Sequence, residues 1–191
     1  MKVVAFNGSA RKDGNTAILV NYVLAELEKE GISTELVQLA GKEVRPCIAC
    51  RKCFDNTDQR CAVKGDYLNT CLEKMIDAHG IILASPTYFA DLSAQIKALI
   101  DRAGYVGRAN QGMYRRKVGA AVVAVRRAGS VQAFDSINHF FLYSEMIVPS
   151  SSYWNIGIGK DIGDVENDAE GIETMKTLGQ NMAWLMKKIY S

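Results

Sequence analysis

Four of the five cysteines in this chain lie between residues 47 and 61, and their spacing suits a metal cluster. Cys47, Cys50 and Cys53 are each separated by two residues, so their thiols can point into one pocket. The chain that leads to Cys61 is long enough to span a cluster. Four thiolates match the ligands of a [4Fe-4S] cluster. The segment 45–64 is also rich in Lys and Arg, which favours thiolate over thiol and offsets the negative charge of a cluster.

Two other interpretations of these cysteines stay open. Zinc sites usually divide four cysteines into two separated pairs, which is not the pattern here. Reduced thiols, or a C-x-x-C pair that cycles between dithiol and disulfide, also agree with the spacing. The pattern departs from bacterial ferredoxin, in which three residues precede the fourth cysteine and a proline follows it, whereas Ala62 follows Cys61. Cys71 falls on the apolar face of a predicted helix, so we assign it to the core.

The bulk properties indicate one ordinary globular domain. A chain of 191 residues suffices for one domain with a substantial core, which we take as residues 1–191. The net charge of +2 gives no reason to expect nucleic acid or a membrane surface as partner. The first residues resemble no signal peptide, and no apolar stretch reaches the length of a membrane span. We therefore expect a cytoplasmic protein, in which clustered cysteines more often bind metal or do redox work than form disulfides.

Short apolar runs alternate with amphipathic segments along the whole chain. The runs predict strands at 2–6, 33–39, 80–85, 118–125 and 146–148, and the amphipathic segments predict helices that start near residues 15, 66, 91, 130 and 168. Unbroken apolar strands are typical of a parallel sheet that helices cover on both faces. The prediction is an α/β protein with a flavodoxin-like, doubly wound, five-stranded parallel sheet of order 2-1-3-4-5. The Cys-rich segment 45–64 is then an insertion after strand 2.

The loop after the first strand, "NGSARKDGNT", has the composition of a phosphate site. Ligands of such folds bind beyond the carboxyl ends of the strands. Free backbone N–H groups at a helix start favour phosphate, while Ser9, Asn15 and Thr16 add donors and Arg11 adds a cation. The glycine spacing fits neither a Walker A loop nor a dinucleotide fingerprint, which leaves one terminal phosphate monoester. A polar turn before a well-capped helix would have the same composition.

The loops after the third and fourth strands suit a flat redox ring. "SPTYFADLS" offers Pro86 to stiffen the turn, backbone donors from Thr87, and aromatic surface from Tyr88 and Phe89. "RRAGS" places Arg126 and Arg127 at the same edge of the sheet. Their charge would lie beside a ligand that becomes anionic on reduction, as a flavin does. In isolation, core packing and solvated arginines explain these two loops equally well.

Together the loops resemble the NAD(P)H-dependent FMN reductase superfamily, and the cysteines make the chain most similar to its iron–sulfur flavoprotein branch. The resemblance rests on "GSARKDGNT", "SPTYFADLSAQIKALIDR" and "RRAG", and extends to "SYWN" at 152–155. It implies that the FMN phosphate lies at the first loop and that the ring lies beside the other two. The residues so implied are Ser9, Arg11, Asn15, Thr16 and Ala17, then Pro86, Thr87, Tyr88 and Phe89, then Arg126, Arg127 and Gly129. It also implies a homodimer or homotetramer.

The expected function is that of an FMN-dependent oxidoreductase or electron-transfer flavoprotein. It would relay electrons between FMN and a [4Fe-4S] cluster on Cys47, Cys50, Cys53 and Cys61, with NAD(P)H as a transient donor and a ferredoxin or quinone-type acceptor as redox partner. Two alternatives stay open: an NAD(P)H-dependent FMN or quinone reductase without a cluster, and a redox-sensing or partner-binding flavoprotein. No side chain is assigned a catalytic role, because the cofactor supplies the chemistry.

Overall fold

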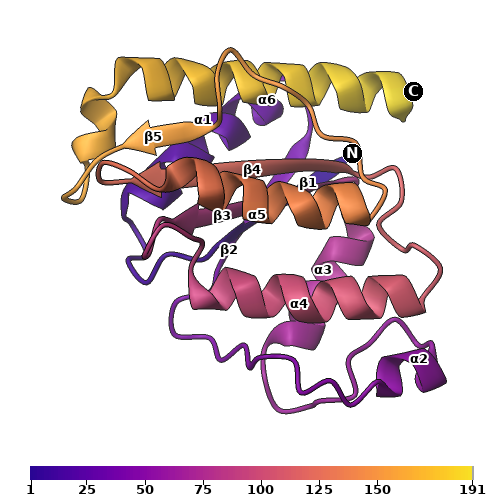
Figure 1. Ribbon diagram of the computed structural model, residues 1–191. Coiled ribbons are helices and arrows are strands. Elements are labelled where there is room, and N and C mark those ends of the chain that lie inside the picture. The colour runs from indigo at the N-terminus through magenta and orange to yellow at the C-terminus, as the bar shows by residue number, and fades with distance from the viewer. Residues whose placement is uncertain (191) are drawn as a thin grey trace.

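The computed structural model describes residues 1–190 and contains one sheet of five parallel strands (Figure 1). The strands are β1 (Lys2–Asn7), β2 (Ser33–Gln38), β3 (Gly80–Pro86), β4 (Val118–Val125) and β5 (Ile156–Ile158). The helices are α1 (Asn15–Lys29), α2 (Lys52–Asn56), α3 (Leu68–Asp77), α4 (Ala94–Ala109), α5 (Ser130–Tyr143), the 3-10 helix η1 (Asp164–Asn167) and α6 (Ala169–Ile189). The strand order β2-β1-β3-β4-β5 confirms the predicted order.

The sheet separates two hydrophobic cores. Because successive side chains of a strand point to opposite faces, Val4 and Phe6 of β1 join the core under α3, α4 and α5. Val3 and Ala5 join the core under α1 and α6 on the other face. Figure 1 shows α6 and α4 on opposite sides of the sheet. All eight residues of β4 are buried. This burial on both faces explains why the central strands are continuous apolar runs.

Local signals define where the main helices begin and end. The Ser93 hydroxyl caps α4 by accepting a hydrogen bond from the N–H of Ile96 at 3.5 Å, and the Asp168 carboxylate caps α6 through the N–H of Gly171 at 3.0 Å. Gly31 follows α1 with a φ of +76°, a left-handed conformation that glycine adopts without a steric penalty. These signals are visible in the sequence, so the helices fall close to the predicted segments.

The prediction of the fifth strand was wrong. Residues 146–148 make only one bridge to the sheet, between Ile147 and Val118, and the chain then leaves the sheet at Pro149. The fifth strand is Ile156–Ile158, which pairs with residues 123–125 of β4. This strand is short and contains Gly157, where a Cβ atom would lie 2.5 Å from Leu19 Cδ2. Its place depends on packing against α1, which the local apolar pattern does not reveal.

The Cys-rich segment lies between β2 and α3, as expected for an insertion after the second strand. It runs along α4 and contains the short helix α2, at the lower right of Figure 1. The next helix, α3, begins at Leu68 rather than at Asp66, and α4 begins at Ala94 rather than near residue 91. Within residues 1–190, none of the helices combines the length and hydropathy that crossing a bilayer requires.

Candidate functional site

A crevice of about 180 Å³ lies at the carboxyl ends of the strands. The register explains its position, since Asn7 at the end of β1 is level with Gln38 of β2 and Ala84 of β3. Loops that follow different strands therefore meet at one edge of the sheet. The lining residues are Ser9, Arg11, Asn15, Thr16, Pro86, Thr87, Tyr88, Ala124, Val125, Arg126, Gly159 and Lys160.

Hydrogen bonds hold the first loop in a fixed shape. The side-chain oxygen of Asn7 accepts from the N–H of Ser9 at 2.9 Å, and the Ser9 hydroxyl accepts from the N–H of Arg11 at 3.1 Å. The side chain of Gln38 donates to the carbonyl of Ser9 at 2.7 Å. The helix α1 starts at this loop after Gly14, and no side chain caps its first turn. The N–H groups of Asn15 and Thr16, which make no backbone hydrogen bond with any described residue, are therefore available to an anion.

The segment after β5 forms a wall of the crevice that the sequence did not predict. Its residues Gly159 and Lys160 line the crevice. The carbonyl of Lys160 accepts from Arg11 Nη1 at 3.3 Å. The amide of Asn15 donates to the carbonyl of Asp161 and accepts from the N–H of Gly163, both at 2.9 Å. Asn15 thus holds this wall. The glycines of "NIGIGKDIG" were the available signal, but the misplaced fifth strand hid it.

The loop after β3 forms a tight aromatic turn. The N–H and carbonyl groups of Tyr88 and Asp91 are paired, at 2.8 and 3.0 Å. Phe89 and Ala90 between them have φ angles of +49° and +61°, values that favour glycine. The turn leaves Tyr88 half-exposed on the crevice wall and directs Phe89 fully into solvent. A Cβ atom on Gly129 would lie 2.7 Å from the Cα of Ala90, so this glycine permits the close approach of the next loop.

The structure brings most of the predicted phosphate and ring residues together, but not all of them. Ser9, Arg11, Asn15, Thr16, Pro86, Thr87, Tyr88 and Arg126 line the crevice. The other predicted residues lie outside its lining. Ala17 is buried behind the first turn of α1, Phe89 and Arg127 are exposed, and Gly129 packs behind the aromatic turn. Arg126 is therefore the arginine of the pair that reaches the crevice.

The four clustered cysteines line a second cavity, against α4. Cys47, Cys50, Cys53 and Cys61 share it with Ile48, Arg51, Ala62, Val63, Arg102, Tyr105 and Val106. The backbone turns sharply between the cysteines, since Ala49 and Arg51 have φ angles of +52° and +59°. Within residues 1–190, no group of three or more His, Cys, Asp or Glu side chains is arranged to hold a single metal ion. Cys71 lies in the core, as predicted, where burial raises its thiol pKa to about 12.

Two basic residues of the Cys-rich segment pair with carboxylates rather than with its thiols. Arg60 pairs with Glu73 at 2.5 Å, and Arg45 reaches Glu43 at 3.3 Å. Burial raises the pKa of the Cys53 thiol above its usual value, and the charges of the other clustered cysteines raise it further. The cation that does reach a thiol is Arg102, whose Nη2 donates to Cys61 Sγ at 3.2 Å. Sequence reasoning did not connect Arg102 with the cysteines, because its segment reads as an ordinary amphipathic helix.

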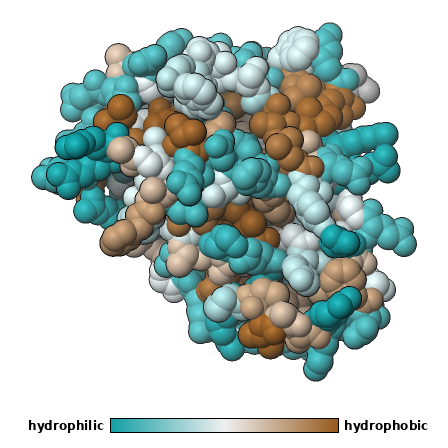
Figure 2. All heavy atoms as spheres, in the orientation of Figure 1, coloured by the Kyte–Doolittle hydropathy of each residue, from teal (hydrophilic) through white to brown (hydrophobic). Residues whose placement is uncertain are grey.

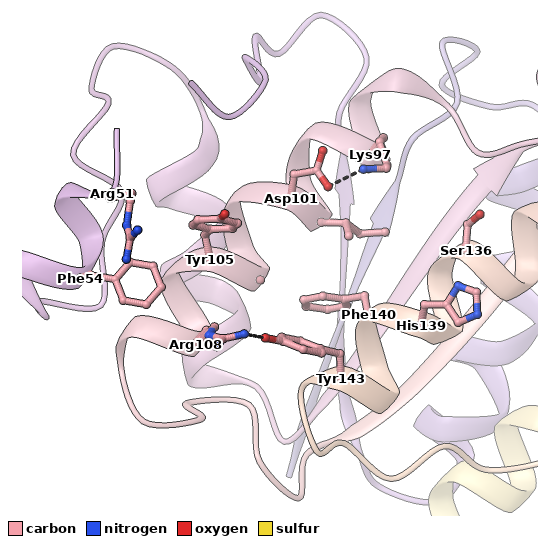
Figure 3. Close-up of a pocket in the computed structure, with 12 residues that line it drawn as sticks. Arg51, Phe54, Lys97, Asp101, Tyr105, Arg108, Ser136, His139, Phe140 and Tyr143 are labelled. Atoms are coloured by element: carbon pink, nitrogen blue, oxygen red, sulfur yellow. Dashed lines mark hydrogen bonds and ion pairs between the residues drawn. The ribbon is translucent and has the colours of Figure 1, made fainter. Parts of the chain in front are cut away.

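A larger groove, about 760 Å³, lies elsewhere, between α2, α4 and α5 (Figure 3). Phe54, Tyr105 and Tyr143 point toward it, and Arg108 hydrogen-bonds the Tyr143 hydroxyl across its lower side. Arg51 and Tyr105 line both this groove and the cysteine cavity. Volume alone does not identify the cofactor site, because the loops that suit a phosphate and a flat ring meet at the smaller crevice.

Comparison with known proteins finds a matching family model and several similar relatives. The family model described as NADPH-dependent FMN reductase matches residues 1–161. The chain is 41% identical to an iron–sulfur flavoprotein of Methanocaldococcus jannaschii over 99% of both chains. It is 31% identical to an iron–sulfur flavoprotein of Methanosarcina thermophila over 99% of this chain and 97% of that one.

Solved structures share the fold at low sequence identity. The crystal structure of RosB with bound 8-demethyl-8-formylriboflavin-5'-phosphate has a TM-score of 0.79 at 18% identity, over 100% of this chain and 80% of that one. A WrbA-like flavodoxin from Agrobacterium tumefaciens has a TM-score of 0.67 at 13% identity, over 98% of this chain and 97% of that one. These likenesses support the flavodoxin-like arrangement of the sheet and helices.

Proposed function

The chain belongs to the NADPH-dependent FMN reductase family, and from this premise we propose that the crevice holds FMN and the cysteine cavity holds a [4Fe-4S] cluster. The family makes the protein an FMN-dependent oxidoreductase. The finer proposal is that it relays electrons between the two groups. The observation that carries it is that four cysteines line one cavity on the same molecule as the crevice.

The crevice has the features that FMN requires of a protein. The uncapped first turn of α1, with Thr16 and the guanidinium of Arg11, suits a phosphate monoester. Gly159 lets the wall pack closely against η1, since a Cβ atom there would lie 2.6 Å from the N of Val165. At about 180 Å³ the crevice is smaller than most ligand pockets. It therefore suits the phosphate and ribityl chain, with the ring beside Tyr88 and Arg126 at its open side.

The chain's residues orient and tune the bound groups. When bound, FMN exchanges a hydride or single electrons, and a cluster exchanges one electron at a time. Arg126 supplies positive charge at the crevice, and this charge would stabilise the negative charge that a flavin ring gains on reduction. Because Tyr88 is half-exposed, the side of the crevice proposed for the flavin ring is open to solvent, and a donor such as NAD(P)H can reach the ring there. The helix α4 links the sites: it starts after the aromatic turn, and Tyr105 lines the cysteine cavity roughly 15 Å further along.

The set of four cysteines at the cavity of about 20 Å³ suits a cluster better than a single ion. A zinc ion with metal–sulfur bonds of about 2.3 Å draws its four sulfurs close together, and the described residues offer no such group. A four-iron cluster has one iron for each thiolate and so spreads its ligands over a larger space. Ala49 and Arg51 have left-handed backbone conformations, which cost free energy. The contacts of a tightly held loop can offset this cost. The relatives from Methanocaldococcus jannaschii and Methanosarcina thermophila carry the name iron–sulfur flavoprotein.

The first experiment measures FMN affinity. We expect protein stripped of flavin to quench FMN fluorescence on binding, and Arg11→Gln to weaken the affinity about tenfold, because a charge-assisted bond to phosphate is lost. Lys12→Gln is the matched control, since Lys12 is an exposed neighbour outside the crevice lining. Wild-type protein that does not bind FMN, or equal losses in both variants, would contradict the proposed phosphate site.

The second experiment separates the relay from a reductase without a cluster. The latter has one observation in its favour, the raised pKa of the buried Cys53 thiol, which favours the protonated form. Iron and acid-labile sulfide are measured after anaerobic purification and reconstitution. About four irons per chain support the relay. Flavin with turnover of NAD(P)H but no iron would support the simpler reductase.

We also propose that the protein forms a homodimer or larger homo-oligomer. Hydrophobic side chains gather over α5 and the chain that leads from it to β5, as Figure 2 shows. The exposed apolar residues there include Leu142, Tyr143, Tyr153 and Trp154. Monomeric proteins rarely expose large contiguous apolar patches. Light scattering after size exclusion tests this proposal: Leu142→Asp should shift wild-type oligomer to monomer, and a monomeric wild type would contradict it.

A further inference from the structure

Arg102 is a charged side chain in the interior of the protein. It projects from α4 with only 1% of its side chain exposed, and its partner Asp66 is 0% exposed. A buried ion pair rarely stabilises a fold more than apolar residues of the same size would. The pair therefore calls for an explanation beyond packing.

The contacts of Arg102 tie together both ends of the Cys-rich segment. One nitrogen, Nη1, donates to the carbonyl of Arg45 at 3.1 Å, before the first cysteine. The other, Nη2, donates to the carbonyl of Val63 and to Cys61 Sγ, both at 3.2 Å. Asp66 fixes the guanidinium in turn and also accepts from the N–H of Arg45 at 3.1 Å. One side chain thus closes the loop that carries all four cysteines.

One donor of this guanidinium has no acceptor. The Nε–H of Arg102 is buried and makes no hydrogen bond with any described residue. Arg102 also lines the cavity that the four cysteines share. Buried donors nearly always find acceptors in native proteins, and guanidinium can only donate. Arg102 thus brings an unmet donor to the lining of this cavity, and a bound group with acceptor atoms would satisfy it.

We propose that Arg102 is a positioning residue of the cysteine site, which holds Cys61 in place and donates hydrogen bonds to the sulfur atoms of the bound cluster. This inference rests on the proposed cluster. Reduction adds an electron to a group that is already negatively charged, and hydrogen bonds and positive charge at its sulfurs stabilise the reduced form. Arg102 therefore raises the reduction potential of the cluster. The neighbouring Arg60 does not share this role, since it pairs with Glu73.

The test compares reconstituted variants by iron content and by the midpoint potential of the cluster, measured by electron paramagnetic resonance during a redox titration. Arg102→Lys keeps the charge but loses the fork of donors. The double variant Arg102→Met/Asp66→Asn removes the pair without leaving a buried unpaired charge. We expect both midpoints to fall, the double variant's further, or iron to be lost from a protein that still binds FMN. Arg60→Gln, which removes a neighbouring surface charge, should leave both readouts near wild type.

Each outcome bears on the proposal. Full iron content with an unchanged midpoint in Arg102→Lys and in the double variant would overturn it, and so would an equal fall in Arg60→Gln. If the double variant does not fold, the Lys variant alone decides by the same criterion. Wild-type protein that takes up no iron would overturn the proposed cluster itself, and this inference with it.

Discussion

Gly129 lies where the loop after β4 passes closest to the aromatic turn after β3. Its φ is +88°, and a Cβ atom would lie 2.7 Å from the Cα of Ala90. We expect Gly129→Ala to destabilise the protein by about 2 kcal/mol or more, because the left-handed backbone costs about 1–2 kcal/mol and the contact adds strain. It should also weaken FMN binding by displacing Tyr88. Urea unfolding and FMN titration measure the two effects.

The matched control is Gly31→Ala. Gly31 has a φ of +76°, but no atom lies within 4 Å of the position that a Cβ atom would take there, and the residue is far from the crevice at the end of α1. This variant should show the backbone penalty alone, with FMN affinity unchanged. Equal losses in the two variants would show that the close approach to Ala90 has no energetic importance.

Asp66 makes the stability of the protein depend on pH. Burial raises the pKa of its carboxyl group, but hydrogen bonds from Arg102 and from the N–H of Arg45 outweigh burial, so the pKa lies below its usual value. A carboxyl whose folded pKa is lowered contributes stability that is present above its unfolded pKa, about 3.9, and is lost as the pH falls through the folded value. We therefore expect the free energy of unfolding to decrease as the pH is lowered below about 4.

Asp66→Asn tests this dependence. Because Arg102 would be left as a buried unpaired charge, we expect the variant to lose about 3–5 kcal/mol at pH 7 and to show a flatter decline in acid. Urea unfolding followed by circular dichroism from pH 7 to pH 3 measures both. Asp101→Asn, which breaks an exposed pair with Lys97 on α4, should cost less than about 1 kcal/mol. Similar losses in both variants would contradict the importance of the buried pair.

At the scale of the elements, two glycines inside helices should respond oppositely to the same substitution. Gly179 of α6 packs on α1, where a Cβ atom would lie 2.7 Å from the carbonyl oxygen of Val23. Gly104 of α4 meets nothing closer than 3.8 Å. Alanine favours a helix interior by about 1 kcal/mol over glycine. We expect Gly104→Ala to raise the stability by up to about 1 kcal/mol and Gly179→Ala to lower it by about 1–3 kcal/mol, both measured by urea unfolding.

The contrast tests how closely α1 and α6 approach. These helices carry the core on one face of the sheet and support β5, so their separation also sets the wall formed by residues 159–163. A stabilising effect of Gly179→Ala would mean that the two helices can move apart at no cost. The same result would weaken the account of how the segment after β5 is held against Asn15.

At the scale of the whole molecule, the two sites should be separable. Cys47 and Cys50 are exposed and contribute nothing to either core. We expect Cys47→Ser/Cys50→Ser to abolish iron uptake while leaving FMN affinity within about twofold and the unfolding free energy within about 0.5 kcal/mol for the flavin-loaded, iron-free protein. Iron analysis, FMN titration and urea unfolding measure these properties.

Cys71→Ser is the opposite case and serves as the control. Cys71 is fully buried in the core and lies outside the cysteine cavity. Its replacement should lower the stability, because a buried hydroxyl lacks a partner there, yet iron uptake should persist in the folded fraction. Loss of FMN binding in the Cys47→Ser/Cys50→Ser variant would show that the two sites depend on each other.

Taken alone, the amino-acid sequence determined four of the five strands, the longer helices and the four clustered cysteines, because local periodicity and spacing specify these features. Eight of the twelve residues predicted for FMN line the crevice for the same reason: they directly follow strands whose ends meet at one edge. Whether they bind FMN stays a prediction that the titrations will test.

Only the tertiary structure decided the rest. β5 lies at Ile156–Ile158 because Gly157 packs against Leu19, and the wall at Gly159 and Lys160 follows from that placement. Arg102 reaches Cys61 although 41 positions of sequence separate them. Such contacts join residues that are distant along the chain. A local sequence pattern shows which side chains are apolar, but it does not show which buried charged side chain contacts which thiol.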